Sequence, residues 1–538
     1  MINLCVIKKN QMRVRLLIAI ICFAFSTATL FAASPAITTK AYPQQIPVLK
    51  GLPHNPVLKV AVAIPAGIHA QLYYAMQVQL NADACKDIEE IALYLTGAEP
   101  FHAQQKIGTA NPTTNTKSSI TSPKAISKVN IPVNAQLHPG MHFIWVSIKL
   151  KESASIDGAI QLKANYLQQA YGAKQLVTAT AGNYKRFKGI AVRKAGDDNV
   201  HTYRIPGIVQ TNKGTLLSVY DIRYKHSGDL PANIDVGLSR STDTGKSWQP
   251  MKVIMDMGTP HENNGVGDPA ILFDPITNKI WVAALWSKGN RSIAGSQPGL
   301  SPDTTGQFVL VCSEDDGLTW SNPINITEQV KKPGWHLFFN GPGSGIAMQD
   351  GKLVFAAQYW DEQKVPHSTI IYSSNHGKSW TGNIHGPKSN TTESQIVETN
   401  KGTLMLNMRD NRGNYRSVAT TNNMGASWTE HASSYNALPD PVCMGSIIKA
   451  KVKIKGQLKE VLFFSNPNTS NGRTHITIKA SLDLGETWHS AHQLLIDERN
   501  SFGYSSLTQI DGHTIGILYE GIRDLYFIKV PVSTIIRK

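Results

Sequence analysis

Five short segments place an acidic or amide side chain, a glycine and a tryptophan at a fixed spacing. The pattern Ser-x-Asp-x-Gly-x-(Ser/Thr)-Trp occupies residues 241–248, 313–320 and 481–488, and looser copies with Asn in place of Asp occupy 373–380 and 421–428. Aspartates beside glycine could coordinate calcium, but the fixed Trp and the missing terminal Glu do not fit an EF-hand. A hairpin turn fits better, because the Asp or Asn accepts backbone N–H bonds, Gly takes a positive φ and Trp packs below. We therefore interpret these segments as structural turns and expect no metal and no cofactor.

A second motif, Tyr203-Arg204-Ile205-Pro206-Gly207, precedes the first of these turns. It resembles the Phe/Tyr-Arg-Ile-Pro motif of sialidases. Together with the Asp-box (BNR) repeats, the resemblance covers residues 188–538 and is to the bacterial exo-sialidases, or neuraminidases. It implies a retaining hydrolase that removes terminal sialic acid from glycans.

Three arginines match the family's carboxylate-binding positions. Sialic acid carries a carboxylate on its anomeric carbon, and a planar guanidinium can bind a carboxylate through paired hydrogen bonds. The resemblance assigns this role to Arg204, Arg409 and Arg473. Arg412 and Arg416 lie close to Arg409 in the chain and remain alternatives for its role.

The substrate carboxylate would also repel an Asp or Glu nucleophile, and sialidases are the glycosidases that use a neutral tyrosine. Tyr504, in Phe502-Gly503-Tyr504-Ser505, matches the family position. A phenol with an ordinary pKa near 10 needs a base beside it. The resemblance assigns that role to Glu393, with Glu398 as the nearest alternative.

The leaving oxygen must receive a proton and water must later lose one, so one carboxyl group has to alternate between acid and base. Asp229 matches the family's acid/base on the loop before the first repeat, and Asp221 and Asp235 are alternatives. Arg223 is expected to contact sugar hydroxyls, whereas Asp221 is expected to support the strand end.

Two weaker matches complete the pocket that the resemblance implies. Asp268, in Gly267-Asp268-Pro269, resembles a family motif that lines the substrate site. Glu520 resembles the carboxylate that orients the first arginine. Either could instead belong to ordinary turn or strand chemistry.

The joint presence of Asp229, Glu393 and Tyr504 favours an enzyme over a sialic-acid-binding lectin or adhesin, which would need only the arginines. A propeller scaffold for protein partners would need neither set. A trans-sialidase, which passes the sugar to another glycan, stays an alternative. Sialylated glycans are the expected partners, whereas linkage preference and oligomeric state are open.

The elements that must position these residues are strands. The five tryptophans are 72, 60, 48 and 60 residues apart, about the length of a four-stranded sheet with its loops. An all-β chain follows, with a six-bladed propeller over residues 186–538. Residues 34–185 are expected to form a smaller sandwich-like domain, and residues 103–128 a long loop or insertion within it. The position of this domain resembles that of the accessory β domains joined to bacterial sialidases, and the resemblance implies that it could bind carbohydrate.

Residues 1–33 have the form of a signal peptide, with Arg13 and Arg15 before an apolar run that ends in small residues. A membrane anchor is the alternative. Export to the periplasm, the cell surface or the medium is expected, without lipid attachment at Cys22 and without stable membrane insertion.

The mature chain is expected to be basic and stabilised by packing. Loss of Lys8, Lys9, Arg13 and Arg15 lowers the formal charge from +15 to +11, and three cysteines remain. An odd number of cysteines gives no disulfide framework. Lys and Arg are scattered without a dense basic tract, which does not favour a nucleic-acid partner.

Overall fold

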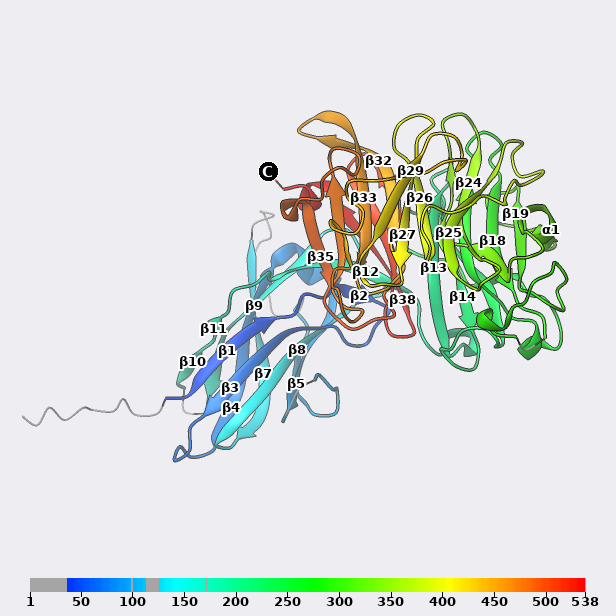
Figure 1. Cartoon of the computed structure of the whole chain (residues 1–538). Coiled ribbons are helices and arrows are strands. Elements are labelled where there is room, and N and C mark those ends of the chain that lie inside the picture. Colours follow the sequence, from blue (N-terminus) through cyan, green and yellow to red (C-terminus); the bar gives the residue numbers. More distant parts are fainter. Residues whose placement is uncertain (1–35, 98–99, 113–124, 171, 290, 538) are drawn as a thin grey trace, which may run out of the picture.

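The computed structural model describes residues 36–97, 100–112, 125–170, 172–289 and 291–537, so the expected leader at 1–33 lies outside it. Strands dominate the described chain. They form an elongated N-terminal part, blue and cyan in Figure 1, and a larger part from green to red. The helical segments are short: η1 (Ala82–Asp87), η2 (Asp197–Asn199), η3 (His261–Asn263), η4 (Ile293–Gly295), η5 (Ser490–His492), α1 (Thr327–Val330) and α2 (Val532–Ile535). None of the helices among the described residues has the length and apolarity to cross a membrane.

The N-terminal part is a two-sheet β sandwich, as predicted. One sheet has the order β11 (Thr178–Ala179), β1 (Thr38–Pro43), β3 (Pro56–Ile64), β8 (Gly140–Leu150), β5 (Ile88–Thr96) and β6 (Lys106–Ala110). The facing strands are β9 (Ala159–Gln169), β4 (Gln71–Asn81), β7 (Ile126–Leu137) and β10 (Lys174–Leu176). Every second residue of β7 is buried, and Val129 and Ile131 meet Val60 and Ile144 in the core between the sheets. Part of the expected 103–128 loop is therefore strand.

One strand, β12 (Lys185–Arg193), belongs to both parts of the molecule. Lys185–Phe187 pair with β9 of the sandwich, and the rest pairs with β38 (Leu525–Pro531) and with β2 (Val48–Lys50). The buried ion pair between Lys188 and Asp87, 2.5 Å long, ties the same strand to the sandwich. A domain boundary at residue 185 remains a prediction, because the hydrogen bonds of β12 run in both directions across it.

The larger part is the predicted six-bladed β-propeller. The first blade consists of β13 (Thr202–Gln210), β14 (Leu216–Arg223), β15 (Ile234–Ser241) and β16 (Lys252–Met255). The second consists of β17 (Val266–Phe273), β18 (Ile280–Trp286), β19 (Gln307–Ser313) and β20 (Ile324–Asn325), with β22 (Gly343–Ser344). The third consists of β21 (Leu337–Asn340), β23 (Ile346–Ala347), β24 (Leu353–Trp360) and β25 (Pro366–Ser373). The fourth blade consists of β26 (Thr391–Glu398), β27 (Leu404–Asp410), β29 (Ser417–Thr421) and β30 (Thr429–Glu430). The fifth consists of β32 (Ser446–Ile454), β33 (Gln457–Pro467), β34 (Ile476–Ser481) and β35 (Gln493–Asp497). The sixth consists of β36 (Ser505–Asp511), β37 (Thr514–Glu520), β38 and β12. A two-stranded ribbon of β28 (Asn414–Tyr415) and β31 (Pro439–Asp440) is added to the fourth.

In the first, second, fourth and fifth blades the Asp box is the turn between the third and fourth strands. In the third blade it follows β25 and is closed by an isolated bridge between Tyr372 and Thr381. In the first box, Asp243 Oδ1 accepts the Ser247 N–H at 3.0 Å and Ser241 Oγ accepts the Gly245 N–H at 2.9 Å. Gly245 has φ +84°, and an added Cβ would lie 2.2 Å from Phe527. The sixth blade takes its fourth strand, β12, from the beginning of the propeller, so it has no such turn and no box.

Candidate functional site

The candidate residues come from different blades but lie at the same end of the strands. Inner strands β13, β17 and β26 begin there, and the second strands β14, β27 and β37 end there, because neighbouring strands are antiparallel. Each of the three inner strands has a register shift at this end: between Arg204 and Gly207, between Gly267 and Ala270, and between Thr391 and Ser394. Such bulges bend a strand and re-aim its side chains. They contain or adjoin Arg204, Asp268 and Glu393.

Tyr504 lies at the centre of the site, just before β36, and is 5% exposed. Its hydroxyl donates to Glu393 Oε1. Arg409 Nη1, from the end of β27, donates to the same hydroxyl at 3.1 Å and to Glu393 Oε2 at 2.5 Å. Burial and the charge of Glu393 raise the pKa of Tyr504 well above its usual range, although Arg409 and Arg204 oppose the shift. The phenol is therefore neutral, with a carboxylate in place to take its proton.

Arg204 is held by the fully buried carboxylate of Glu520 at the end of β37. Its Nε donates to Glu520 Oε1 at 3.1 Å, and its guanidinium lies 4.4 Å from the ring centroid of Phe502. Glu520 also accepts the backbone N–H groups of Ile205 and Tyr504, each at 2.9 Å. Ile205 has φ +58°, an unusual value for a β-branched residue, and this carboxylate stabilises it. One carboxylate thus fixes both an arginine and the tyrosine loop.

Arg473, on the loop between β33 and β34, completes the group. It donates to the carbonyl oxygens of Phe502 at 3.0 Å and Val442 at 3.1 Å. Its guanidinium lies 5.6 Å from the Tyr504 ring centroid, and that of Arg204 lies 5.3 Å from it. The structure therefore brings three arginines from blades one, four and five around one phenol.

Asp229 lies above this group on the exposed loop that follows β14. Arg223 is clamped between two carboxylates, with Nη2 2.8 Å from Asp221 and Nη1 2.7 Å from Asp229. Arg204 Nη1 lies 3.5 Å from Asp229 as well. Partial burial acts to raise the pKa of Asp229, but the charges of Arg223, Arg204 and Arg473 outweigh it and hold the pKa below the ordinary value. Without substrate, this carboxyl group is ionised at neutral pH.

Asp268 adds a second kind of carboxyl group to the site. Its backbone has φ +57° and is fixed by its N–H, which donates to Asp221 at 2.9 Å, and by its carbonyl, which accepts from Asn340 at 2.6 Å. Burial and the nearby charges of Asp221 and Glu393 raise the pKa of Asp268 well above its usual range. The raised pKa favours the protonated form of this carboxyl group, which can donate a hydrogen bond.

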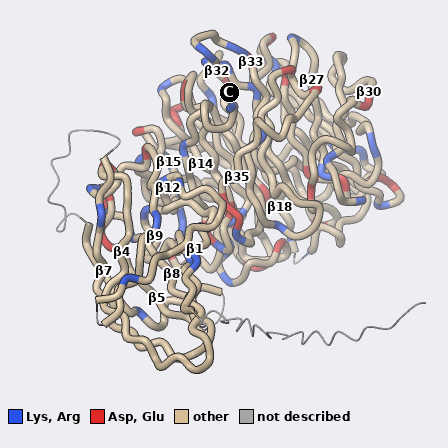
Figure 2. The backbone as a smooth tube through the Cα atoms, turned by 90° about the vertical axis from the view of Figure 1, so that its left-hand side faces the viewer, with Lys and Arg blue, Asp and Glu red and all other residues tan. Residues whose placement is uncertain are grey.

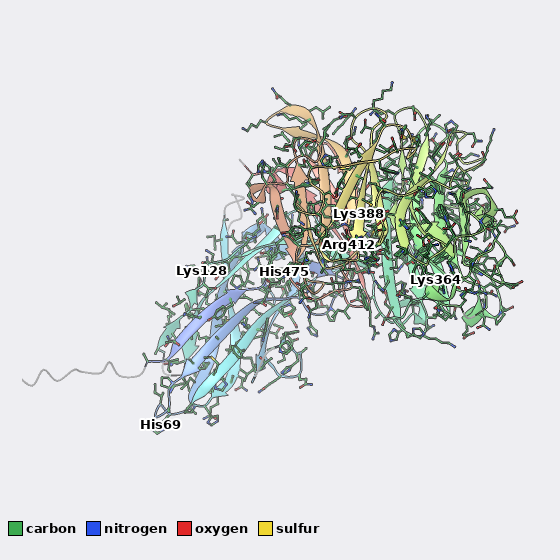
Figure 3. The ribbon with its side chains drawn as sticks, in the orientation of Figure 1. His69, Lys128, Lys364, Lys388, Arg412 and His475 are labelled. Atoms are coloured by element: carbon green, nitrogen blue, oxygen red, sulfur yellow. The ribbon has the colours of Figure 1, made fainter. Side chains whose placement is uncertain are left out.

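The alternative residues are engaged elsewhere. Arg416 is fully buried and donates to Asn407 Oδ1 at 2.8 Å, as a structural arginine does. Arg412 lies at the surface close to Lys388, and both pair with Asp410, at 2.9 and 3.4 Å (Figure 3).

The two remaining carboxylates also lie outside the tyrosine group. Glu398 is at the far end of β26, where it accepts the N–H of Gly402 at 2.8 Å. Asp235 accepts from Tyr224 at 3.0 Å, and burial, with the charge of Asp256, raises its pKa to about 6.

Sequence reasoning did not identify the residues that shape the tyrosine loop. Phe502 stacks on Arg204, and buried Cys443 packs with Ile205 and Tyr504. Gly503 has φ +92°, and a Cβ there would lie 2.9 Å from Cys443 Sγ. The glycine before the tyrosine was the available signal, because only glycine fits that conformation and that space. Phe502 and Cys443 carry no signal without the fold.

Known proteins resemble this chain over nearly its whole described length. A model of the BNR repeat-like domain matches residues 205–520, and one of the N-terminal domain of BNR-repeat neuraminidase matches residues 36–171. A sialidase of Bacteroides fragilis is 45% identical over 477 residues, 84% of this chain and 87% of that protein. A sialidase of Micromonospora viridifaciens is 32% identical over 61% of this chain and 52% of its own. A solved structure, the Hadza microbial sialidase Hz136, has a TM-score of 0.83 at 38% identity and covers 92% of this chain and 100% of its own.

Proposed function

We propose a retaining mechanism with a covalent tyrosyl intermediate for this chain. The chain belongs to the BNR-repeat neuraminidase family and is an exo-α-sialidase, a glycoside hydrolase. Its substrates are sialylated glycans. The observation that carries the mechanism is the position of Tyr504, whose hydroxyl bonds to both Glu393 and Arg409 within a ring of arginines.

Substrate binding is assigned to the three arginines. Arg204, Arg409 and Arg473 would share the carboxylate of sialic acid. Because they converge on Tyr504, the neighbouring anomeric carbon would then lie next to the phenol. Their orientation is fixed before substrate arrives, because each already bonds to protein oxygens. Little reorganisation is needed on binding.

The covalent step is assigned to Tyr504 and Glu393. As the phenol oxygen bonds to the anomeric carbon, its proton passes to Glu393, and the bond from that carbon to the aglycone oxygen breaks. The neutral phenol avoids the repulsion that a carboxylate nucleophile would meet from the substrate. Arg409, which touches both groups, stabilises the charge that moves between them.

Asp229 is the proposed acid, and substrate binding prepares it. In the free enzyme Arg223, Arg204 and Arg473 lower its pKa, so it lacks a proton at neutral pH. A bound carboxylate offsets the charge of the arginines, raises the pKa of Asp229 and favours proton uptake. The proton then passes to the leaving oxygen, and the same carboxylate later deprotonates the water that releases the sugar.

Proton NMR during early turnover of an α-sialoside tests the mechanism. We expect α-sialic acid to appear first and then to mutarotate, because two displacements retain configuration. Initial release of the β anomer contradicts the tyrosyl intermediate. Adding an acceptor glycan to the same reaction separates hydrolysis from transfer, and we expect free sialic acid as the main product.

Export is proposed from residues 1–33, whose basic start and apolar run resemble a cleaved leader. N-terminal sequencing of the protein recovered from its native compartment tests this. Mature chains that begin near residue 34 support export, whereas chains retaining the apolar run in the membrane contradict cleavage.

A further inference from the structure

A network of buried polar residues joins the fourth and fifth blades of the propeller. Its charged members are Arg416, Asp440 and Lys479, each at most 1% exposed. Arg416 directly precedes β29, Asp440 ends β31 and Lys479 lies in β34; the two blades are the neighbouring yellow and orange parts of Figure 1. The mechanism proposed above uses none of these residues. Buried charges are costly unless they are paired and hydrogen-bonded, so their partners show what the network does.

Arg416 and Asp440 together hold the backbone of one residue, Cys443. Asp440 Oδ2 accepts the Cys443 N–H at 3.0 Å, and Arg416 Nη1 donates to the Cys443 carbonyl oxygen. The two charged groups lie 3.7 Å apart, so each also balances the charge of the other. Arg416 is itself fixed by Asn407, whose side-chain and backbone oxygens accept from it at 2.8 and 3.2 Å. Both polar groups of the Cys443 backbone are therefore bound to buried, charged side chains.

Asn466 and Lys479 hold Asp440 from its other side. Asn466 Nδ2 donates to Asp440 Oδ1 at 3.1 Å and to the Pro439 carbonyl oxygen at 2.8 Å. Lys479 Nζ donates to Asn466 Oδ1 at 2.8 Å. Burial lowers the pKa of Lys479 to about 7, so near neutral pH Arg416 is the permanent positive charge beside Asp440.

The segment that this network holds is in contact with the active site. Val442 has φ +57°, an unusual value for a β-branched residue, and its carbonyl oxygen accepts from Arg473 Nη2 at 3.1 Å. Such a conformation persists only where the surrounding structure holds it. The Cys443 side chain packs with Tyr504, and its Sγ lies 3.8 Å from the Phe502 carbonyl oxygen, which also accepts from Arg473.

Arg473 depends on its backbone partners more than the other two arginines of the site do. Arg204 is paired with Glu520, and Arg409 is paired with Glu393. Among the described residues Arg473 has no carboxylate partner, and its guanidinium donates to two backbone carbonyl oxygens instead. Its direction is therefore set by the segments that carry those oxygens.

We propose that Arg416 and Asp440 are positioning residues for the reaction. They hold residues 442–443 in the conformation in which this segment orients Arg473 and packs against Tyr504. The inference rests on the proposed function, because Arg473 matters here as a ligand of the substrate carboxylate.

Asp440→Asn tests the proposal, because it removes the charge beside Arg416 and keeps the size of the side chain. We expect the KM for a fluorogenic α-sialoside and the inhibition constant of a sialic-acid analogue each to rise about tenfold, as when one charge-assisted hydrogen bond is lost. The kcat should fall less. Arg416→Lys keeps the buried charge but loses the fork that reaches Cys443, so it should act in the same direction if Asp440→Asn folds poorly.

Asp316→Asn is the matched control. Asp316 is also a buried carboxylate of the propeller, paired with Arg240 at 2.5 Å, but it lies in the second Asp box. Its replacement should lower the melting temperature as Asp440→Asn does, and leave KM and the inhibition constant within twofold. Equal kinetic effects in these two variants, or unchanged constants in both Asp440→Asn and Arg416→Lys, overturn the proposal.

A double-mutant cycle separates positioning from a general loss of stability. Arg473→Lys should raise KM by itself, and adding Asp440→Asn should raise it less than about twofold further, because both changes remove the same interaction. Effects that multiply as independent factors contradict an action through Arg473.

Alkylation of Cys443 measures the segment itself, without substrate. Burial raises the pKa of Cys443 to about 12, so its thiol should react slowly with iodoacetamide in the folded wild type. Mass spectrometry below the melting temperature should show faster labelling of Cys443 in Asp440→Asn, but not in Asp316→Asn. Protection of Cys443 in both Asp440→Asn and Arg416→Lys overturns the inference even if the wild type cleaves sialosides. Faster labelling in a protein whose wild type cleaves none overturns the proposed function alone.

Discussion

The two ends of the inner strands of the propeller differ in how their charges are arranged. At the active-site end, Arg204, Arg409 and Arg473 converge on one phenol. At the far end, a hollow of about 420 Å³ contains Lys449 and Glu460, which pair with one another at 3.6 Å. Convergence of like charges from separate blades, and not the presence of a hollow, distinguishes the site.

The backbone differs in the same way. At the active-site end, Ile205 and Asp268 have positive φ within bulges of inner strands, and each precedes a proline that cannot donate to the sheet. At the far end, positive φ occurs in the turns between strands, including the Asp boxes, where both Thr244 and Gly245 have it. One end aims side chains, and the other only reverses the chain. The charges elsewhere are mixed, with Lys and Arg among Asp and Glu over the whole tube (Figure 2).

The largest effect expected at the active-site end is that of Tyr504→Phe. Removing the hydroxyl removes the nucleophile and its bonds to Glu393 and Arg409, so kcat on a fluorogenic α-sialoside should fall at least about a thousandfold. The variant should still fold, because the ring keeps its contacts with Ile205 and Cys443. Retention of more than a tenth of the wild-type kcat contradicts the role of Tyr504.

Glu520→Gln should have the next largest effect and can be matched with a residue at the far end. Glu520 is fully buried and accepts from Arg204, Ile205 and Tyr504. Replacing it leaves a buried arginine poorly paired, so we expect a loss of about 3 kcal/mol in the free energy of unfolding. Because Glu520 positions Arg204, KM should also rise, with kcat/KM about a hundredfold lower.

Glu398→Gln is the control for that comparison. Glu398 is also buried and accepts two backbone N–H groups, from Gln349 at 2.9 Å and Gly402 at 2.8 Å, but at the far end of β26. It should lower the free energy of unfolding by about 1 to 3 kcal/mol and leave kcat/KM within twofold. Similar kinetic losses in both variants contradict the functional difference between the ends.

Ligand binding near Asp229 should cause proton uptake, which only the active-site end can produce. The arginines hold its pKa below the ordinary value, and a ligand carboxylate that offsets their charge must raise it. Binding of a sialic-acid analogue in mildly acidic buffer should therefore take up as much as one proton. Calorimetry in two buffers of different ionisation enthalpy measures this. Proton release, or equal uptake by Asp229→Asn, contradicts the assignment.

Gly245→Ala should separate stability from activity at the far end. The new Cβ would meet Phe527 at 2.2 Å and would be held at φ +84°, so we expect a loss of about 3 kcal/mol in the free energy of unfolding. Gly214→Ala, at φ +79° with nothing within 4 Å, should lose only about 1 kcal/mol. Both should keep kcat/KM within twofold below their melting temperatures. A large kinetic loss in either would mean that the two ends are coupled.

The sequence was sufficient to predict the strands and the blade count, and it named candidate site residues that the fold brings together, for physical reasons that differ. The Asp boxes recur because each blade needs the same tight turn, and Gly245 shows why the glycine cannot vary. The site residues were found by resemblance, since Arg409 and Tyr504 are 95 positions apart and no local pattern joins them.

What could not be predicted depends on contacts between distant segments. The missing sixth box required knowing that β12 pairs with β38. The stacking of Phe502 on Arg204 and the positive φ of Ile205 depend on Glu520, more than 300 residues along the chain. The raised pKa of Asp268 likewise depends on burial and on charges that only the folded chain brings together.

The smallest effect is expected from Lys451→Gln. This variant sharpens the comparison because it removes a cation from the hollow at the far end of the inner strands. Lys451 is exposed and lies 3.8 Å from Glu460, a distance at which a surface pair contributes less than about 1 kcal/mol. The free energy of unfolding and kcat/KM should both stay close to wild type, at low and at high salt. If the far hollow also attracted the anionic sugar, kcat/KM would fall in this variant at low salt and recover at high salt, because added ions screen the remaining field. The arrangement of the arginines at the other end opposes that outcome, since only there do several guanidinium groups face one point.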